Sequence, residues 1–115
     1  MKALLLMAHG SPRPEANEDV RRVAALLHER FPIVVIGYLD CNQPDIPAAI
    51  DHCVATGATS IVAVPYLLHS GRHFLIDMPE LLDQGAARHP GVEFRMGDYI
   101  GHMPQIDDVL RDRAR

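Results

Sequence analysis

The sequence predicts an α/β fold: an open four-stranded parallel sheet with helices on both faces. Apolar runs of strand length recur at residues 3–8, 33–39, 59–67 and 92–97. The first three runs are continuous rather than alternating, which is typical of parallel strands that are covered on both faces. A stretch with helical character follows each run. The order of elements is therefore βαβαβαβα, which forms parallel sheets with right-handed crossovers.

The first two helices are predicted by apolar periodicity and by capping residues. Residues 15–31 have acidic side chains in their first turns and apolar side chains at i, i+3 and i+4 spacing, namely Val20, Val23, Ala24, Leu27 and Phe31. Residues 44–57 open on prolines and close on Gly57, and glycine is the usual residue at a helix exit. We therefore expect one helix between each pair of the first three strands.

Two more helices are expected in the C-terminal half. Residues 77–89 begin with Asp77 and Glu80 in the spacing of a capping box, with a proline in the first turn. Residues 103–115 supply a last helix with Ile106, Val109 and Leu110 facing inward. At 115 residues, the chain is expected to form a single domain, residues 1–115.

Composition excludes several functional classes. Hydrophobic residues make up 48% of the chain and the net charge is −4, which indicates a globular, soluble protein. The longest basic run is a pair of arginines, which argues against a nucleic-acid partner, and no apolar segment has the length of a membrane span. Cys41 and Cys53 have no CxxC spacing, and reduced thiols are typical of the cytosol. We therefore expect a cytoplasmic protein with no nucleic-acid or membrane partner.

Histidines gather where the predicted strands end. In open parallel sheets, ligands bind beyond the carboxyl ends of the strands. Residues 9–15, 40–45, 67–73 and 98–105 fall at that edge, and they hold four of the seven histidines: His9, His69, His73 and His102. The other three lie within helices or at their ends, at His28, His52 and His89. The imidazoles therefore indicate a candidate site at one edge of the sheet.

Several of these residues also have a structural interpretation. His9 is either a turn residue on a tight strand exit, or a ligand or base held by a stiff strand end. His69 and His73 are four residues apart, but Gly71 between them argues against the helix that would pair them as ligands. Asp77 could orient His73, although its capping-box position favours a cap.

Two further residues fall at this edge, and the absence of certain motifs excludes some classes of enzyme. Cys41 is expected to be a small half-buried thiol rather than a soft ligand, and His102 fits a ligand and a solvated turn residue equally well. No glycine-rich phosphate loop follows a strand, and no GxSxG elbow is present. An imidazole-rich edge with Arg13 and Arg72 nearby suits a divalent transition metal together with an anionic ligand.

Three segments resemble one family. "LLMAHGSPRPEANEDV" (residues 5–20), "PYLLHSGRHFLIDMP" (65–79) and "IGHMPQIDDVL" (100–110) are together similar to the short class II sirohydrochlorin chelatases of the CbiX and SirB types. The similarity covers nearly the whole chain. It implies a chelatase-like fold, half of a two-lobed class II chelatase. It also implies a lyase that inserts cobalt or iron, or in some members nickel, into sirohydrochlorin in tetrapyrrole biosynthesis, which leads to cobalamin or siroheme.

The resemblance also implies the site residues. The two active-site histidines of the family fall on His9 and His73, which are then catalytic and metal-binding, and His69 is an extra imidazole. Contacts to the substrate carboxylates are expected from the rest of the two loops, at Gly10, Ser11, Arg13, Ser70, Gly71 and Arg72. The metal is a substrate, so no tightly bound cofactor is expected. Members of this length work as homodimers.

The size of the sheet favours a homodimer independently. Four strands at ~4.8 Å spacing give an edge under ~20 Å wide. A tetrapyrrole is nearly that broad, so one subunit covers at most one of its faces. A pocket that buries most of its ligand needs a second wall, and a twofold-related copy is the simplest source of one.

Two other functions fit parts of the pattern. A non-catalytic protein that binds a divalent metal or a tetrapyrrole would carry the same imidazoles without turnover. The stretch "LLMAHGSPRP" also resembles the strand-one signature of histidine phosphatases, but Ala8 stands where their phosphate-binding arginine is needed. The chelatase interpretation requires His9 and His73 to converge over one cavity.

Overall fold

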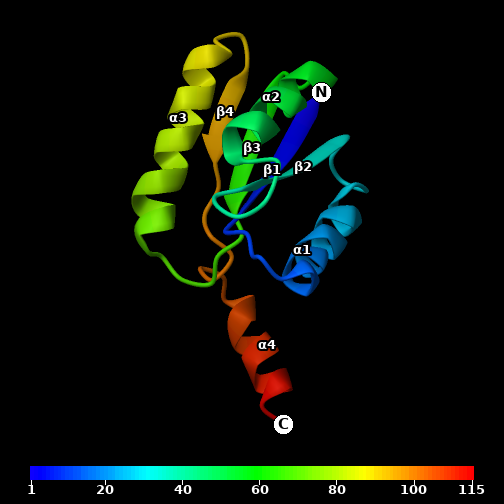
Figure 1. The fold of residues 1–115 in the computed structure, drawn as a ribbon. Coiled ribbons are helices and arrows are strands. Elements are labelled where there is room, and N and C mark those ends of the chain that lie inside the picture. The colour runs from blue at the N-terminus through cyan, green and yellow to red at the C-terminus, as the bar shows by residue number, and fades with distance from the viewer.

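The computed structural model describes residues 1–115 and contains one four-stranded parallel sheet. Its strands are β1 (Lys2–Ala8), β2 (Ile33–Tyr38), β3 (Ser60–Pro65) and β4 (Glu93–Met96). The order across the sheet is β2-β1-β3-β4, and all neighbouring pairs are parallel (Figure 1). The predicted fold class is confirmed, and each predicted strand lies at its expected place in the chain.

Helices cover both faces of the sheet. The helices of the chain are α1 (Pro14–Leu27), α2 (Ile46–Thr56), α3 (Met78–Arg88) and α4 (Gln105–Arg113), and a π-helix, η1 (His73–Asp77), leads directly into α3. α2 and α3 pack on one face and α1 packs on the other (Figure 1). Right-handed crossovers produce this arrangement, because the chain moves one way from β1 to β2 and the other way from β2 to β3 and β4. None of these helices is long and apolar enough to span a bilayer.

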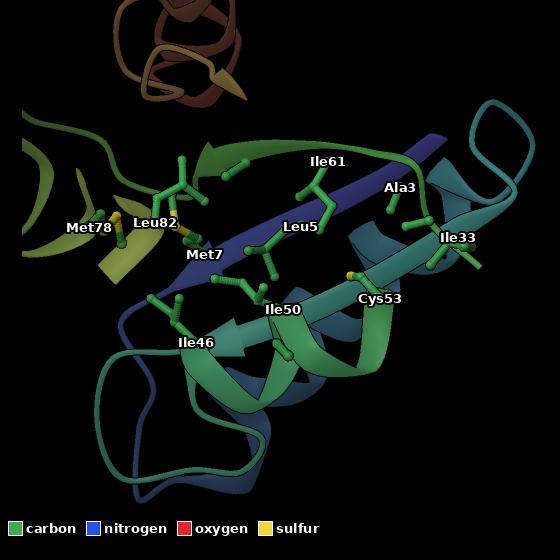
Figure 2. Close-up of a cluster of buried hydrophobic side chains, with 13 residues drawn as sticks. Ala3, Leu5, Met7, Ile33, Ile46, Ile50, Cys53, Ile61, Met78 and Leu82 are labelled. Atoms are coloured by element: carbon green, nitrogen blue, oxygen red, sulfur yellow. The ribbon is translucent and has the colours of Figure 1, made fainter. Parts of the chain in front are cut away.

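Alternation along the central strand divides the core in two. Ala3, Leu5 and Met7 of β1 face α2 and α3, in a cluster of 13 buried residues (Figure 2). Leu6 and Ala8 face α1, in a smaller cluster of five buried residues. Because β1 is buried on both faces, its carboxyl end is a fixed point from which the next residues leave the sheet.

α2 has the capping pattern that the sequence predicts. Asp45 has an extended backbone, with φ −71° and ψ 173°, and its carboxylate accepts a hydrogen bond from the Ala48 N–H at 2.9 Å. The helix ends at Gly57, which has a φ of 116° that favours glycine. An aspartate at this position satisfies an N–H group that the helix leaves unpaired, and such caps contribute ~1 kcal/mol.

The predicted capping box at α3 is wrong. Asp77 has a helical backbone, with φ −68° and ψ −47°, because η1 continues into α3, and its carboxylate makes no capping hydrogen bond. A side chain caps a helix where the backbone is extended, as it is at Asp45. The Asp77 carboxylate instead contacts His73, one turn earlier.

The predicted inward placement of the last helix is also wrong. α4 projects away from the sheet (Figure 1), and none of its residues is buried. Val109 and Leu110, which were expected to face the core, are 51% and 61% exposed. An amphipathic pattern identifies an apolar helix face but does not determine which surface that face meets.

Candidate metal-binding site

His9 leaves the end of β1 with its backbone held in place. The pairing of β1 and β2 continues past both strands, since the Asp40 N–H donates to the His9 carbonyl at 3.0 Å. Gly10 then turns the chain with a φ of 93°, and an added Cβ there would lie 2.0 Å from the Asp40 carbonyl oxygen. The turn therefore requires glycine, and it determines where the His9 imidazole lies.

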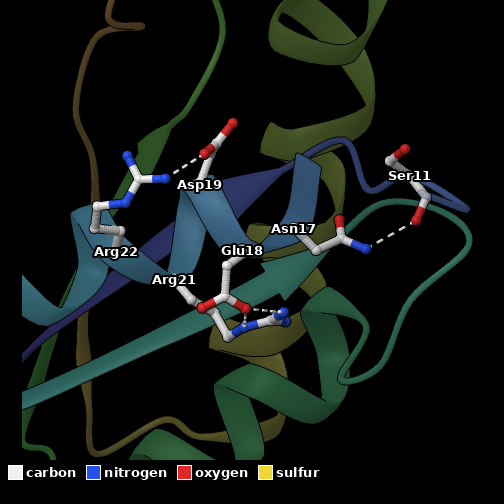
Figure 3. Close-up of polar contacts among 6 residues, drawn as sticks. All are labelled: Ser11, Asn17, Glu18, Asp19, Arg21 and Arg22. Atoms are coloured by element: carbon white, nitrogen blue, oxygen red, sulfur yellow. Dashed lines mark hydrogen bonds and ion pairs between the residues drawn. The ribbon is translucent and has the colours of Figure 1, made fainter. Parts of the chain in front are cut away.

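The loop after His9 is tied to its neighbours. The Ser11 N–H donates to Asn42 Oδ1 at 2.7 Å. Asn17, which is buried in α1, donates from Nδ2 to the Ser11 carbonyl at 2.8 Å (Figure 3). These bonds hold the loop between α1 and the segment after β2, so His9 is presented on a rigid support.

His73 is presented by the π-helix. It is the first residue of η1, and its carbonyl accepts the Met78 N–H in an i+5 hydrogen bond. Its Nδ1 lies 3.0 Å from Asp77 Oδ2. The wide turn of a π-helix brings residues four apart to nearly the same side, which places this carboxylate against the imidazole.

The two imidazoles meet over one cavity. Their ring centroids are 4.9 Å apart and their planes are inclined by 73°. The cavity has a volume of about 350 Å³ and is lined by both histidines together with Leu39, Asp40, Asp77, Glu80 and Leu81. The structure thus brings His9 and His73 together in a cavity that three carboxylates also line.

Hydrogen bonding leaves the same ring nitrogen free on both histidines. Nδ1 of His9 lies 3.1 Å from the Gly10 carbonyl oxygen, and Nδ1 of His73 faces the Asp77 carboxylate. Both partners only accept hydrogen bonds, so each Nδ1 carries the proton when the ring is neutral. Each Nε2 then holds a lone pair that can bind a divalent metal or accept a proton.

The residues expected to bind substrate carboxylates flank this cavity but do not line it. They are Gly10, Ser11 and Arg13 after His9, and Ser70, Gly71 and Arg72 before His73. The Ser11 N–H, which was offered for a substrate carboxylate, is donated to Asn42. The Arg72 side chain is 79% exposed, with its Nε 3.9 Å from Asp77 Oδ1.

Three other residues at strand exits lie outside the cavity. His69 is exposed in the loop before η1. His102 bonds through Nδ1 to Asp98 and stacks on Tyr99, and the hydrogen bond from His102 holds the pKa of Asp98 below its usual value. Cys41 is exposed rather than half-buried as predicted, because it occupies a surface turn with a φ of 66°.

The acidic character of the cavity is not predicted by the sequence pattern. Asp40 and Glu80 line it together with Asp77. Asp40 directly follows the predicted strand 33–39, so its position at the same edge could have singled it out, whereas the spacing of Glu80 predicts a helix cap. Three larger hollows, of about 570, 580 and 480 Å³, each contain a single histidine or carboxylate side chain, at Glu93, His52 and Asp98 respectively. The chemistry of the lining, rather than cavity size, identifies the site.

The fold and the cavity define an α/β protein with a candidate metal-binding site, in which two imidazoles and three carboxylates line one cavity at the carboxyl edge of a parallel sheet. The CbiX family model matches residues 3–115. The sirohydrochlorin cobaltochelatase of Saccharolobus solfataricus is 35% identical over 120 residues, which cover 99% of this chain and 94% of the relative. The chain belongs to the CbiX family.

Longer relatives match over only part of their length. The sirohydrochlorin cobaltochelatase of Priestia megaterium is 28% identical over 97% of this chain, which covers 37% of that protein. The sirohydrochlorin chelatase SirB from Bacillus subtilis subspecies spizizenii, solved in complex with cobalt, superposes with a TM-score of 0.91 at 28% identity. That match covers 98% of this chain and 49% of SirB, so the chain spans half or less of these longer proteins.

Proposed function

We propose that this chain is a sirohydrochlorin chelatase, a lyase that inserts cobalt into sirohydrochlorin, with iron or nickel as alternative metals. The observation that carries the proposal is the approach of His9 and His73, from two different strand exits, to a ring separation of 4.9 Å. Each ring keeps its Nε2 free, because Nδ1 takes the hydrogen bond. The relatives named sirohydrochlorin cobaltochelatase support the same reaction.

The cavity suits the handling of a divalent cation. The carboxylates of Asp40, Asp77 and Glu80 line the same cavity as the two imidazoles, and their negative charge attracts a cation that enters from water. Imidazole binds Co²⁺, Fe²⁺ and Ni²⁺, and it accepts a proton near neutral pH. The pyrrole N–H groups must lose their protons as the metal enters the macrocycle, and we assign the Nε2 atoms of His9 and His73 as the bases that accept them.

The loops on either side of the cavity suit the substrate. Sirohydrochlorin is a polycarboxylate, and guanidinium groups bind carboxylates with paired hydrogen bonds. We assign this contact to the flanking residues Gly10, Ser11, Arg13, Ser70, Gly71 and Arg72. The macrocycle then lies over the opening of the acidic cavity, and the cation approaches it from the cavity side.

The proposal includes no resident cofactor. The metal is consumed together with the tetrapyrrole and is therefore a substrate. The cysteines Cys41 and Cys53 are both free thiols, which suits a reducing compartment, and we assign the protein to the cytoplasm.

His73→Ala tests the proposal, with His69→Ala as its matched control. Both substitutions remove an exposed imidazole at the exit of β3, but only His73 lines the cavity. The absorbance of sirohydrochlorin is followed with Co²⁺, Fe²⁺ or Ni²⁺, with and without protein. We expect wild type and H69A to accelerate metallation, and H73A to lose about 100-fold or more of that rate while keeping its circular dichroism spectrum.

Two results would contradict this assignment. Wild-type turnover by H73A would remove the role given to His73. A wild-type protein that binds Co²⁺ but never exceeds the spontaneous rate of metallation would instead be a non-catalytic binding protein.

We also propose that the chain is a single chelatase-like domain that works as a homodimer. Its cavity is open to solvent, and the chain matches 49% of the length of SirB, as expected for a unit that needs a second copy. α4 has a stripe of apolar residues in which Val109 and Leu110 are exposed and Ile106 is half-buried. An unpartnered apolar helix face of this kind is stabilised by packing against another surface.

A second copy offers a suitable surface for α4. α1 packs against β1 and β2, and the β3–β4 side of the sheet has a hollow of about 570 Å³ lined in part by Lys2, Val62 and Arg95. The negative charges of Asp107 and Asp108, in the first turn of α4, are complementary to the positive charges that Lys2 and Arg95 bring to the hollow. Exchange of α4 between two copies would bury its apolar stripe and cover the hollow.

Val109→Glu tests the dimer, with Leu26→Glu as its matched control. Both residues are exposed apolar side chains on helices, at 51% and 70%, but Leu26 belongs to α1. We expect wild type and L26E to be dimers by size-exclusion chromatography with light scattering, and V109E to be a monomer. A monomeric wild type would contradict the dimer, and a dimeric V109E would contradict the exchange of α4.

A further inference from the structure

Asp77 has a partner that its place in the sequence does not explain. It makes no capping hydrogen bond, although it immediately precedes α3. Its Oδ2 lies 3.0 Å from His73 Nδ1, and its side chain is 32% exposed. Its Oδ1 faces the guanidinium of Arg72, with Nε at 3.9 Å. The two oxygens therefore have different partners, and only Oδ2 is directed at the imidazole.

We infer that Asp77 is a positioning residue that holds His73 with its proton on Nδ1 and its Nε2 lone pair available to the cavity shared with His9. The inference rests on the proposed function, since it explains how one of the two imidazoles is prepared for the metal. The hydrogen bond made by one ring nitrogen selects the tautomer and so decides what the other nitrogen can do. Without an acceptor at Nδ1, a neutral ring is free to carry its proton on Nε2, which blocks the ligand position.

The π-helix gives this pair its geometry. His73 and Asp77 are the first and last residues of η1, and the i+5 bond from the Met78 N–H to the His73 carbonyl closes the turn around them. The pair therefore belongs to a continuous helix that runs into α3. Met78, which follows it, is fully buried and anchors that helix in the core. The orientation of the carboxylate is thus set by packed backbone rather than by a loop.

The chain contains a second pair of the same kind that serves as a control. His102 bonds through Nδ1 to Asp98, four residues earlier in the sequence. Neither residue lines the cavity of His9 and His73. Substitution of Asp98 therefore removes the same type of contact from a histidine outside the proposed site.

The test compares Asp77→Leu, Asp77→Asn and Asp98→Leu with wild type. The tautomer of His73 is read from the imidazole ¹⁵N NMR signals of the metal-free protein, assigned with H73A. In D77L we expect the proton to move to Nε2 and the Kd for Co²⁺ to rise about 10–100-fold. The kcat for metallation should fall with it, while KM for sirohydrochlorin stays within about twofold because the substrate loops are intact.

D77N tests the effect of the negative charge, and D98L is the control. In D77N the amide oxygen still accepts a hydrogen bond but without charge, so we expect a smaller rise in Kd, of about 3–10-fold. In D98L the His73 signals and the Kd for Co²⁺ should match wild type. If D77L does not fold, the Kd of D77N for Co²⁺ tests the inference by itself, and a wild-type value would overturn it.

Several outcomes would overturn the inference. An unchanged His73 tautomer and Kd in D77L and D77N would show that Asp77 does not orient the ring. An equal loss in D98L and D77L would show that the effect is not specific to this pair. A tautomer change in D77L, in a protein that never metallates sirohydrochlorin, would support the positioning role and reject the chelatase proposal instead.

Discussion

Replacing Gly10 by alanine tests whether the turn after β1 holds His9 in place. Gly10 has a φ of 93°, which residues with a side chain rarely adopt, and an added Cβ would lie 2.0 Å from the Asp40 carbonyl oxygen. Relief of this clash requires the turn to open. Opening separates the Asp40 N–H from the His9 carbonyl, which are 3.0 Å apart in the structure. The substitution therefore acts on the backbone that joins two sides of the cavity.

The expected loss of stability is substantial. A positive φ costs a residue with a Cβ about 1–2 kcal/mol, and the lost backbone hydrogen bond adds about 1 kcal/mol, for a total of about 2–3 kcal/mol. For a chain of 115 residues, 1 kcal/mol corresponds to roughly 4 °C in melting temperature. We therefore expect G10A to melt roughly 8–12 °C below wild type.

Gly91→Ala is the matched control, because Gly91 has no positive φ and no atom lies within 4 Å of an added Cβ. Thermal unfolding by circular dichroism and titration with Co²⁺ are measured for both variants. G10A should lose melting temperature and Co²⁺ affinity, while G91A should match wild type. Equal melting temperatures for the two variants would refute the constrained turn. Wild-type Co²⁺ affinity in a destabilised G10A would refute the link between the turn and His9.

Three further changes test the core, an ion pair and the thiols. Ile50→Ala, in the large core cluster, should lower the free energy of unfolding in urea by about 2–5 kcal/mol because it leaves a cavity, and a loss below ~1 kcal/mol would contradict the packing. Hydrogen bonds from His89 and Arg88 lower the pKa of the Asp51 carboxyl in the folded protein. These bonds therefore stabilise the fold at pH values above the ordinary carboxyl pKa, and the stabilisation is lost as the pH falls through the lowered pKa of Asp51. Asp51→Asn should therefore flatten the acid side of the stability profile by at most ~1 kcal/mol, since the pair is exposed, and an unchanged profile would show that it contributes nothing. Burial raises the pKa of the Cys53 thiol to about 11. A thiol reagent near neutral pH should therefore modify only Cys41 in the native protein, and both cysteines in denaturant. Modification of Cys53 in the native protein would contradict its burial.

The elements of the fold are determined largely by local patterns in the sequence. Continuous apolar runs mark buried parallel strands, and Asp45 and Gly57 mark the two ends of α2. These patterns are local because each depends on hydrogen bonds or side-chain directions within a few residues. His9 and His73 were singled out on the same basis, since the exits of parallel strands lie at one edge of the sheet.

The contacts between distant segments were decided only by the tertiary structure. Asp40 meets His9 through the pairing of β1 with β2, which joins residues about 30 positions apart, so no local pattern records it. Asp77 has the spacing of a cap, but a π-helix ahead of α3 turns its carboxylate toward His73 instead. The sequence pattern around Val109 shows that one face of α4 is apolar, but it does not show which surface packs against that face. Periodicity determines which elements form, whereas the meeting of two side chains depends on how those elements pack, and that is a property of the whole chain.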